Sequence, residues 1–258
     1  MTAISFTVEK SVCTISINLP AKRNAVNGPV AAELRAAFER FEADDALHVA
    51  VLTGSGGHFC SGADLAAVAD PALRNELDPQ GGGSGPMGPT RMALKKPLIA
   101  AINGHAVAGG LELALLADLR VADEDAVLGV FCRRWGVPLI DGGTVRLPRI
   151  VGMGRALDMI LTGRSVSAQE ALAMGLVNRL TPTGSALAVA QEMAHQLAAF
   201  PQQCMLADRH SAYAQWDLPL AEALRQEGAL GVPLVAAEGE VGAARFLQGA
   251  GRHGNFGD

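Results

Sequence analysis

The sequence lacks any apolar run long enough to cross a lipid bilayer, which argues against a membrane-spanning helix. Its first ten residues carry neither the basic start nor the long apolar stretch of a secretory signal. We therefore expect a cytoplasmic protein with no membrane partner. Only 18% of the 258 residues are charged and 49% are hydrophobic, a balance that predicts a soluble, globular chain with a large core.

Paired cysteines, metal motifs and a surplus of positive charge are also missing. The four cysteines are scattered without metal-ligand spacing, as is typical of free thiols in a reducing compartment. The histidines show no ligand spacing either, and we expect them on the surface or in ordinary packing, so no metal site is predicted. No Walker phosphate loop, HExxH zinc motif or G-x-S-x-G elbow occurs. The net charge of −5 weighs against a nucleic-acid partner.

What is present is a long apolar stretch, Lys96–Arg120, that is interrupted by two glycine turns. Its first part, Pro97–Ile102, is short and apolar, as expected of a strand buried on both faces, and an Asn-Gly pair marks its end. A second break, Gly109-Gly110, precedes the apolar segment Leu111–Ala117. Because Glu112 is the one polar residue in that segment, the pattern predicts a buried helix with a carboxylate in its first turn.

Glu112 has two interpretations from these residues alone. Acidic side chains are common in first turns, because a carboxylate complements the helix dipole and the free N–H groups of a helix start. The adjacent glycines favour the second interpretation, since residues without Cβ let a ligand approach the backbone and N–H groups at a helix start bind anions. Glu112 would then be an acid and base beside donors for a developing oxyanion.

Strand, glycine-rich loop and helix start occur together twice in the chain. Val49–Thr53 predicts a buried strand, the ten residues after it are rich in glycine, and Asp64 opens a possible helix. The same order is present at Leu98–Leu115. Repeated alternation of strand and helix predicts parallel strands, whose carboxyl ends are where α/β folds place their sites. We therefore expect the two glycine loops to face each other.

The flanking segments complete the predicted secondary structure. Further strands are expected at Ile4–Glu9, Val12–Asn18, Leu119–Ala122 and Val127–Gly129. An amphipathic helix after Pro29 is predicted by the spacing of Val30, Leu34, Ala37, Phe38 and Phe41. Asp70–Pro89 is expected to be a mobile surface loop that can act as a lid, and Phe131–Arg149 an irregular segment. Later helices are expected at Ser185–Phe200, Gln202–Tyr213, Leu218–Leu230 and Glu238–Leu247.

A series of motifs covers residues from about 20 to 180 in one order and spacing, which is far more specific than a single motif. The segments are Arg23-Asn24-Ala25-Val26, Phe59–Leu65, Lys96–Gly104, Ala108–Ala114, Gly142-Gly143-Thr144 with Arg146-Leu147-Pro148, and Leu161–Gly163 followed by Ala171–Val177. Together they resemble the crotonase family, also called the enoyl-CoA hydratase/isomerase family, where CoA is coenzyme A.

The resemblance implies an α/β fold, a spiral of repeated ββα turns that holds the CoA site, followed by a helical C-terminal region. We expect the spiral core in residues 1–195 and the helical region in residues 196–258. In that family the helical region makes trimers, and commonly hexamers. Apolar positions in the late helices favour the same assembly here: Leu218, Leu220, Leu224, Leu230, Val232, Leu234 and Val235.

The resemblance also implies a site for an acyl-CoA or enoyl-CoA substrate, with CoA as part of the thioester and no tightly bound cofactor. The shared chemistry is stabilisation of a thioester enolate, and the oxyanion donors fall by position on the backbone N–H groups of Ala63 and Gly109. The CoA-binding positions fall on Lys22, Arg23, Ala25, Ala63, Asp64 and Leu65. Lys22 and Arg23 are candidate phosphate contacts, with plain solvated charges as the alternative.

The sequence departs from the hydratases of the family at one catalytic position. Those enzymes use two glutamates to position water, one matching Glu112 and a second whose position falls here on Cys132. A buried thiol is a poor substitute for a carboxylate that exchanges a proton with water, which puts ordinary hydration in doubt. Cys132 is either a small packed residue or a nucleophile whose evident activators are Arg133 and Arg134.

Asp141 is the remaining carboxylate of interest. It precedes two glycines, as a turn residue commonly does, but family isomerases and a dehalogenase carry a catalytic aspartate at this place or one residue away. We predict that Asp141 and Glu112 act as two acid/base groups at different carbons, which would move a double bond without positioned water. The extra residue Ile140 is the weak point, because it can turn the Asp141 side chain outward.

These observations predict an enzyme of fatty acid or related acyl-CoA metabolism, a lyase or isomerase in which Glu112 moves a proton beside a thioester carbonyl. Double-bond isomerisation and hydratase-like lyase chemistry are the favoured reactions. Thioester hydrolysis, and a non-catalytic role in binding CoA or RNA, are the alternatives. The retained Glu112 and both glycine loops favour the enzyme, and the acidic net charge weighs against RNA.

Overall fold

The computed structural model of the protein describes residues 2–251. The chain forms two compact units, the first ending at Ala198 and the second beginning at Ala199. The boundary expected from the sequence, between residues 195 and 196, falls inside helix α6 (Ala186–Ala199).

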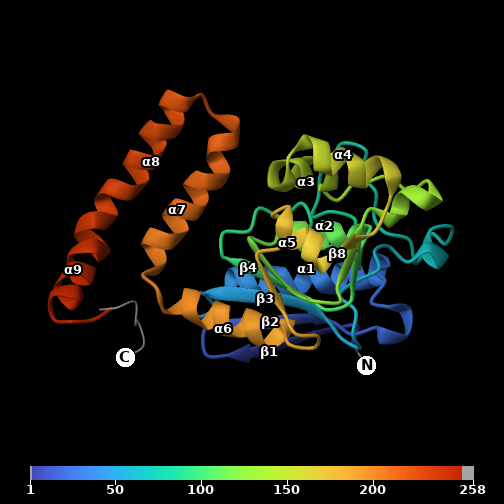
Figure 1. The fold of residues 1–258 in the computed structure, drawn as a ribbon, viewed down its shortest axis with the longest axis horizontal. Helices are drawn as coiled ribbons and strands as arrows, with labels where there is room; N and C mark the ends of the chain where they lie inside the picture. The colour runs from blue at the N-terminus through green and yellow to red at the C-terminus, as the bar shows by residue number, and fades with distance from the viewer. Residues whose placement is uncertain (1, 252–258) are drawn as a thin grey trace. The chain divides into compact units, whose positions relative to one another are not determined.

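The first unit is built on a six-stranded sheet in the order β1-β2-β3-β4-β6-β9 (Figure 1). Its strands are β1 (Ile4–Glu9), β2 (Val12–Ile17), β3 (Val49–Gly54), β4 (Leu98–Ile102), β6 (Leu119–Asp123) and β9 (Arg179–Thr181). β1 and β2 pair antiparallel, and every later pair in this sheet is parallel. The predicted parallel arrangement of the two motif strands is confirmed, because β3 and β4 lie side by side in it.

A second, small sheet supports the central stretch of the sequence. It consists of β5 (His105–Val107), β7 (Val127–Gly129) and β8 (Val166–Ser167), in the order β5-β7-β8. The chain leaves β4, turns through Gly104 with φ 51°, forms β5 and enters α2 (Gly109–Leu116). Two strands from different sheets followed by a helix make one ββα unit, and α2 is its helix.

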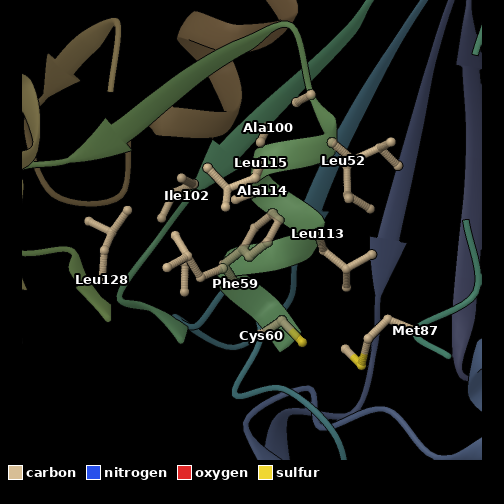
Figure 2. Packing of buried hydrophobic residues seen from close by; sticks show 14 of the residues in the cluster. Leu52, Phe59, Cys60, Met87, Ala100, Ile102, Leu113, Ala114, Leu115 and Leu128 are labelled. Atoms are coloured by element: carbon tan, nitrogen blue, oxygen red, sulfur yellow. The ribbon is translucent and has the colours of Figure 1, made fainter. Parts of the chain in front are cut away.

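The side chains of the large sheet divide between two cores. Val51 and Ile99 pack on one face against α6, while Leu52 and Ala100 pack on the other face. Figure 2 shows this second core around α2, where Leu113, Ala114 and Leu115 lie among side chains from several other segments. All eight residues of α2 are buried, so the helix is enclosed as its apolar sequence predicts.

Helix α1 (Gly28–Ala43) confirms the amphipathic pattern predicted after Pro29. The Asn27 side chain caps it by accepting a hydrogen bond from the Val30 N–H (3.1 Å). All five predicted apolar positions are buried, together with Ala31.

The prediction of an irregular segment at Phe131–Arg149 is wrong for its second half. After a 3-10 helix at Phe131–Trp135, the chain forms α3 (Gly143–Val151), followed by α4 (Met153–Thr162) and α5 (Ala168–Ala173). Helix α3 contains Pro148 and begins at a glycine pair, two features that normally indicate a break. Tertiary packing of its buried side chains therefore outweighs the local signals.

The surface loop predicted at Asp70–Pro89 is only partly exposed. Residues 76–83 are mostly open to solvent, but the last residues, from Pro86 through Thr90, are buried. The short helix expected at Asp64 is a single 3-10 turn, Leu65–Ala67, capped by the Asp64 carboxylate, which accepts from the Ala66 N–H (3.1 Å).

The second unit is helical, as predicted. It contains α7 (Gln202–Ala214), α8 (Leu220–Leu234), a π-helical turn (Val235–Gly239) and α9 (Glu240–Leu247), and α7 and α8 form an antiparallel pair (Figure 1). None of the residues of α7, α8 or α9 is buried within this chain. Across residues 2–251, no helix combines the length and apolar character that crossing a membrane requires.

Candidate active site

The turn into α2 holds its backbone in an unusual conformation. Ala108 has φ 54° and ψ −128°, a region that residues with a Cβ rarely occupy and that costs about 1–3 kcal/mol. The first helical hydrogen bond runs from the Glu112 N–H to the Ala108 carbonyl (3.2 Å), so the N–H groups of the first turn have no acceptor within the helix. Gly110 has no space for a side chain, because a Cβ there would lie 2.1 Å from the Cys60 carbonyl oxygen.

The second glycine loop faces this turn, which confirms the prediction that the two loops meet. The Val26 N–H donates to the Gly62 carbonyl (2.9 Å) and the Asp64 N–H donates to the Val26 carbonyl (3.0 Å), so the N–H of Ala63 points away from Val26. Gly62, with φ 95°, packs so closely that a Cβ would lie 2.9 Å from the Gly109 nitrogen.

These contacts leave two backbone donors near each other. Within residues 2–251, no hydrogen-bond acceptor is recorded for the N–H of Ala63 or of Gly109. Both residues line a cavity of about 720 Å³. The arrangement can therefore donate two hydrogen bonds to an oxyanion bound in the cavity.

Glu112 lies in the same cavity and is 3% exposed. Its Oε1 accepts hydrogen bonds from the N–H groups of Asp141 (2.9 Å) and Gly143 (2.8 Å). A Cβ on Gly143 would lie 2.8 Å from that oxygen, which explains the glycine at this position. The carboxylate is thus fixed by backbone donors from the segment that leads into α3.

The environment of Glu112 favours its protonated form. Burial, followed by the nearby Asp141 carboxylate, raises the pKa of Glu112 from 4.5 to about 7, although the two backbone hydrogen bonds and Arg146 oppose the rise. A carboxyl group with a pKa near 7 can both accept and return a proton at neutral pH, which is what general acid–base catalysis requires.

Asp141 points into the protein, so Ile140 does not turn its side chain outward. The Asp141 Oδ1 accepts a hydrogen bond from the Met87 N–H (2.9 Å) and a short one from the Thr90 hydroxyl. Asp141 is 4% exposed and lines the cavity together with Glu112. Burial raises the pKa of Asp141, and the bonds from Thr90 and Met87 act in the opposite direction.

Cys132 also lines the cavity and is buried in the 3-10 helix. Burial and then the Glu112 carboxylate raise the pKa of its thiol, which disfavours the thiolate that a nucleophilic role would need. Its two proposed activators point to other partners, because Arg134 donates to the Gly163 carbonyl (2.7 Å) and Arg133 to the Ile160 carbonyl (3.2 Å). The geometry favours the packed interpretation of Cys132.

Three of the six residues predicted to bind CoA line the cavity, and the other three lie within two residues of them in the chain. The Lys22 ammonium pairs with the Asp64 carboxylate (2.7 Å), so both charges already have partners. Arg23 and Leu65 line the cavity with Ala63. Ala25 is partly buried beside them and donates its N–H to the Lys22 carbonyl (3.1 Å).

Several residues of the site were missed from the sequence. Thr90 and Met87 donate hydrogen bonds to the Asp141 carboxylate. Both lie more than fifty residues before Asp141 in the chain, and no local pattern indicates this contact. His105 lines the cavity, although its sequence context suggests ordinary packing. Within residues 2–251, no group of three or more histidine, cysteine, aspartate or glutamate side chains is arranged to hold a metal ion.

Comparison with known proteins identifies relatives of this chain. A family model described as enoyl-CoA hydratase/isomerase matches residues 7–248. The chain is 34% identical to enoyl-CoA hydratase EchA19 of Mycobacterium tuberculosis, covering 84% of this chain and 83% of that one. It is 35% identical to 2,3-dehydroadipyl-CoA hydratase of Escherichia coli, covering 93% of each chain. The crystal structure of enoyl-CoA hydratase EchA1 from Mycobacterium marinum is 32% identical and matches with a TM-score of 0.89, covering 96% of each chain.

Proposed function

The chain belongs to the enoyl-CoA hydratase/isomerase family, and from that premise we propose that Glu112 removes and returns a proton beside the carbonyl of an acyl-CoA thioester. The likeness to the solved structures confirms the predicted crotonase-like α/β fold with a helical C-terminal region. The reaction, the role of each residue and the assembly are the proposal.

One observation carries it: a buried carboxyl with a pKa of about 7 shares a cavity with two backbone N–H groups that have no recorded acceptor among residues 2–251. Both recorded hydrogen bonds to Glu112 end on Oε1, which leaves Oε2 to exchange a proton with the substrate. The N–H groups of Ala63 and Gly109 donate to the thioester oxygen as it gains negative charge. Fixed donors of this kind typically contribute about 3 kcal/mol each to the transition state.

Two reactions are consistent with this arrangement, and different observations support them. Asp141, which lines the cavity beside Glu112, supports double-bond isomerisation, since two carboxyl groups can serve two carbons of the acyl chain. The names of the relatives, enoyl-CoA hydratase and 2,3-dehydroadipyl-CoA hydratase, support addition or removal of water. The buried thiol of Cys132 is a weak partner for water, so we favour isomerisation.

The exposed apolar side chains of the second unit support an assembly. Nine large apolar or aromatic side chains between residues 199 and 251 are more than half exposed in the single chain: Tyr213, Trp216, Leu220, Leu224, Val232, Val235, Val241, Phe246 and Leu247. Patches of this kind commonly mark interfaces between subunits, and we propose a trimer or hexamer.

The test is a panel of acyl-CoA and enoyl-CoA thioesters incubated in deuterated water. Exchange of the α-proton, movement of a double bond, hydration and release of free CoA are measured together. Glu112→Gln should retain CoA binding and lower α-proton exchange by at least about a hundredfold, the usual scale for general acid–base catalysis. Glu192→Gln, an exposed position of α6, is the matched control. Unchanged exchange in Glu112→Gln would remove Glu112 from the mechanism, and release of free CoA alone would indicate a thioester hydrolase.

A further inference from the structure

Two histidines form a pair, and one of them, His105, lines the cavity. The Nδ1 atoms of His58 and His105 lie 3.3 Å apart, and the ring centroids are 5.0 Å apart with the planes at 70°. Gly104 allows this contact, because a Cβ at that position would lie 2.7 Å from His58 Nδ1. Since two nitrogens at this distance share one hydrogen, one ring donates from Nδ1 and the other accepts.

The pair adjoins a cationic part of the cavity edge. His105, Arg23 and Ser61 all line the cavity. Two backbone hydrogen bonds hold them together. The Cys60 N–H donates to the His105 carbonyl (2.9 Å), and the N–H of the next residue, Ser61, donates to the Arg23 carbonyl (3.0 Å). The nearby Lys22 is paired with Asp64 (2.7 Å), whereas Arg23 lines the cavity together with His105.

The surroundings of His105 favour its neutral form. Burial, then His58, then the Arg23 guanidinium lower the pKa of His105 below its ordinary 6.5, and Asp125 acts in the opposite direction. An anionic ligand beside Arg23 would reverse this balance, because it would stabilise a positive charge on the imidazole.

We propose that the His58–His105 pair, together with Arg23, binds a phosphate of the CoA moiety and takes up one proton from solvent when that phosphate arrives. The inference rests on the proposed acyl-CoA function. His105 donates its Nδ1–H to His58 and receives the proton on Nε2, so that the imidazolium donates to a phosphate oxygen. No covalent bond to phosphorus forms or breaks.

The proposal fixes the direction of a pH effect. Below the pKa of His105 in the free protein, the ring is already charged and binding takes up no proton. Above that pKa and below the higher pKa of the complex, each bound phosphate brings one proton, and the dissociation constant rises by up to about tenfold per pH unit. Above both values, binding is weaker and independent of this group.

The experiment is isothermal titration calorimetry between pH 5.5 and 8, in pairs of phosphate-free buffers with different ionisation enthalpies. The ligands are CoA, dephospho-CoA without the 3′-phosphate, and 4′-phosphopantetheine. The difference between buffers gives the number of protons taken up. Because the phosphate monoester itself titrates near pH 6, proton uptake by the native protein and by the variants is compared with the same ligand, also at pH 8 where the phosphate is fully ionised before binding.

Two variants of His105 separate the roles of its two ring nitrogens, and a third variant is the control. His105→Asn keeps a polar group near the Nδ1 position toward His58 but removes Nε2, and His105→Gln places a neutral donor near the Nε2 position. Both should take up no proton, and His105→Asn should bind CoA about tenfold more weakly near pH 6.5 because a charged hydrogen bond is lost. His195→Gln, on α6, is the control and should behave as the native protein does.

The ligands identify which phosphate is bound. Proton uptake that disappears with dephospho-CoA assigns the 3′-phosphate, and uptake that persists with it assigns the pyrophosphate. Equal proton uptake by the native protein and both His105 variants would overturn the inference while leaving the acyl-CoA function intact. A native protein that binds no CoA would overturn the proposed function and the inference together.

Discussion

Replacing Glu112 with glutamine should stabilise the folded protein at alkaline pH. The pKa of Glu112 is 4.5 in an unperturbed chain and about 7 in the folded one, so between these values the native state holds a proton that the unfolded state has lost. Stability therefore falls as pH rises through this window. At about 1.4 kcal/mol per pH unit, the native protein loses about 3 kcal/mol that an uncharged side chain would not lose.

Glutamine is a suitable probe because it keeps an oxygen that can accept from the N–H groups of Asp141 and Gly143. Urea unfolding followed by circular dichroism, at pH 4.5 and pH 8 and at one protein concentration, measures the difference in unfolding free energy. We expect native protein and Glu112→Gln to be nearly equal at pH 4.5, and the variant to be more stable by about 3 kcal/mol at pH 8.

The matched control, Glu192→Gln, replaces an exposed glutamate and should leave the pH dependence unchanged. If Glu112→Gln differs from the native protein by the same amount at both pH values, then Glu112 titrates as an ordinary surface carboxylate. The argument from burial would then fail, and with it the main support for Glu112 as a base poised at neutral pH.

Three further predictions concern the neighbours of Glu112 and the assembly. Asp141→Asn should abolish isomerisation of a 3-enoyl-CoA while α-proton exchange by Glu112 continues; survival of both activities would make Asp141 a turn residue. The native protein should hydrate short enoyl-CoA poorly, and Cys132→Glu should raise that rate in a spectrophotometric assay, whereas a high native rate would reveal another water-positioning group. Multi-angle light scattering at micromolar concentration should give a trimer or hexamer, because α8 and α9 expose large apolar side chains, and a stable monomer would refute this.

The parts of the fold that follow local periodicity could be predicted from the sequence. Helix α1 has the apolar spacing of an amphipathic helix, and β3 and β4 are short apolar runs that end at turn residues; all three are present as expected. Helix α3 could not be predicted in the same way, because its glycine start and Pro148 indicate a break. The buried end of the Asp70–Pro89 loop was missed because Met87 and Thr90 are held by Asp141, 54 and 51 residues away along the chain.

The residues of the candidate site also differ in whether the sequence alone could predict them. Glu112 could be identified because a single carboxylate in an apolar helix is a local anomaly, and the facing glycine loops followed from their repeated order along the chain. The inward direction of Asp141 and the pairing of Lys22 with Asp64 depend on tertiary contacts that no spacing records. The motifs that resemble the crotonase family supplied what periodicity could not.

Several features that conflict with ordinary folding rules lie around one cavity. Ala108 holds a backbone conformation that suits glycine better, Gly62 and Gly110 leave no space for a Cβ, and Glu112 is buried where its charge is costly. Each feature destabilises the fold on its own, and neighbouring segments must hold it in place. Conflicts of this kind are expected where a site is prepared for chemistry, because the same contacts that cost stability orient two N–H donors and tune one carboxyl group. The predicted gain in stability of Glu112→Gln, together with its loss of proton exchange, therefore tests whether one residue carries both the cost and the function.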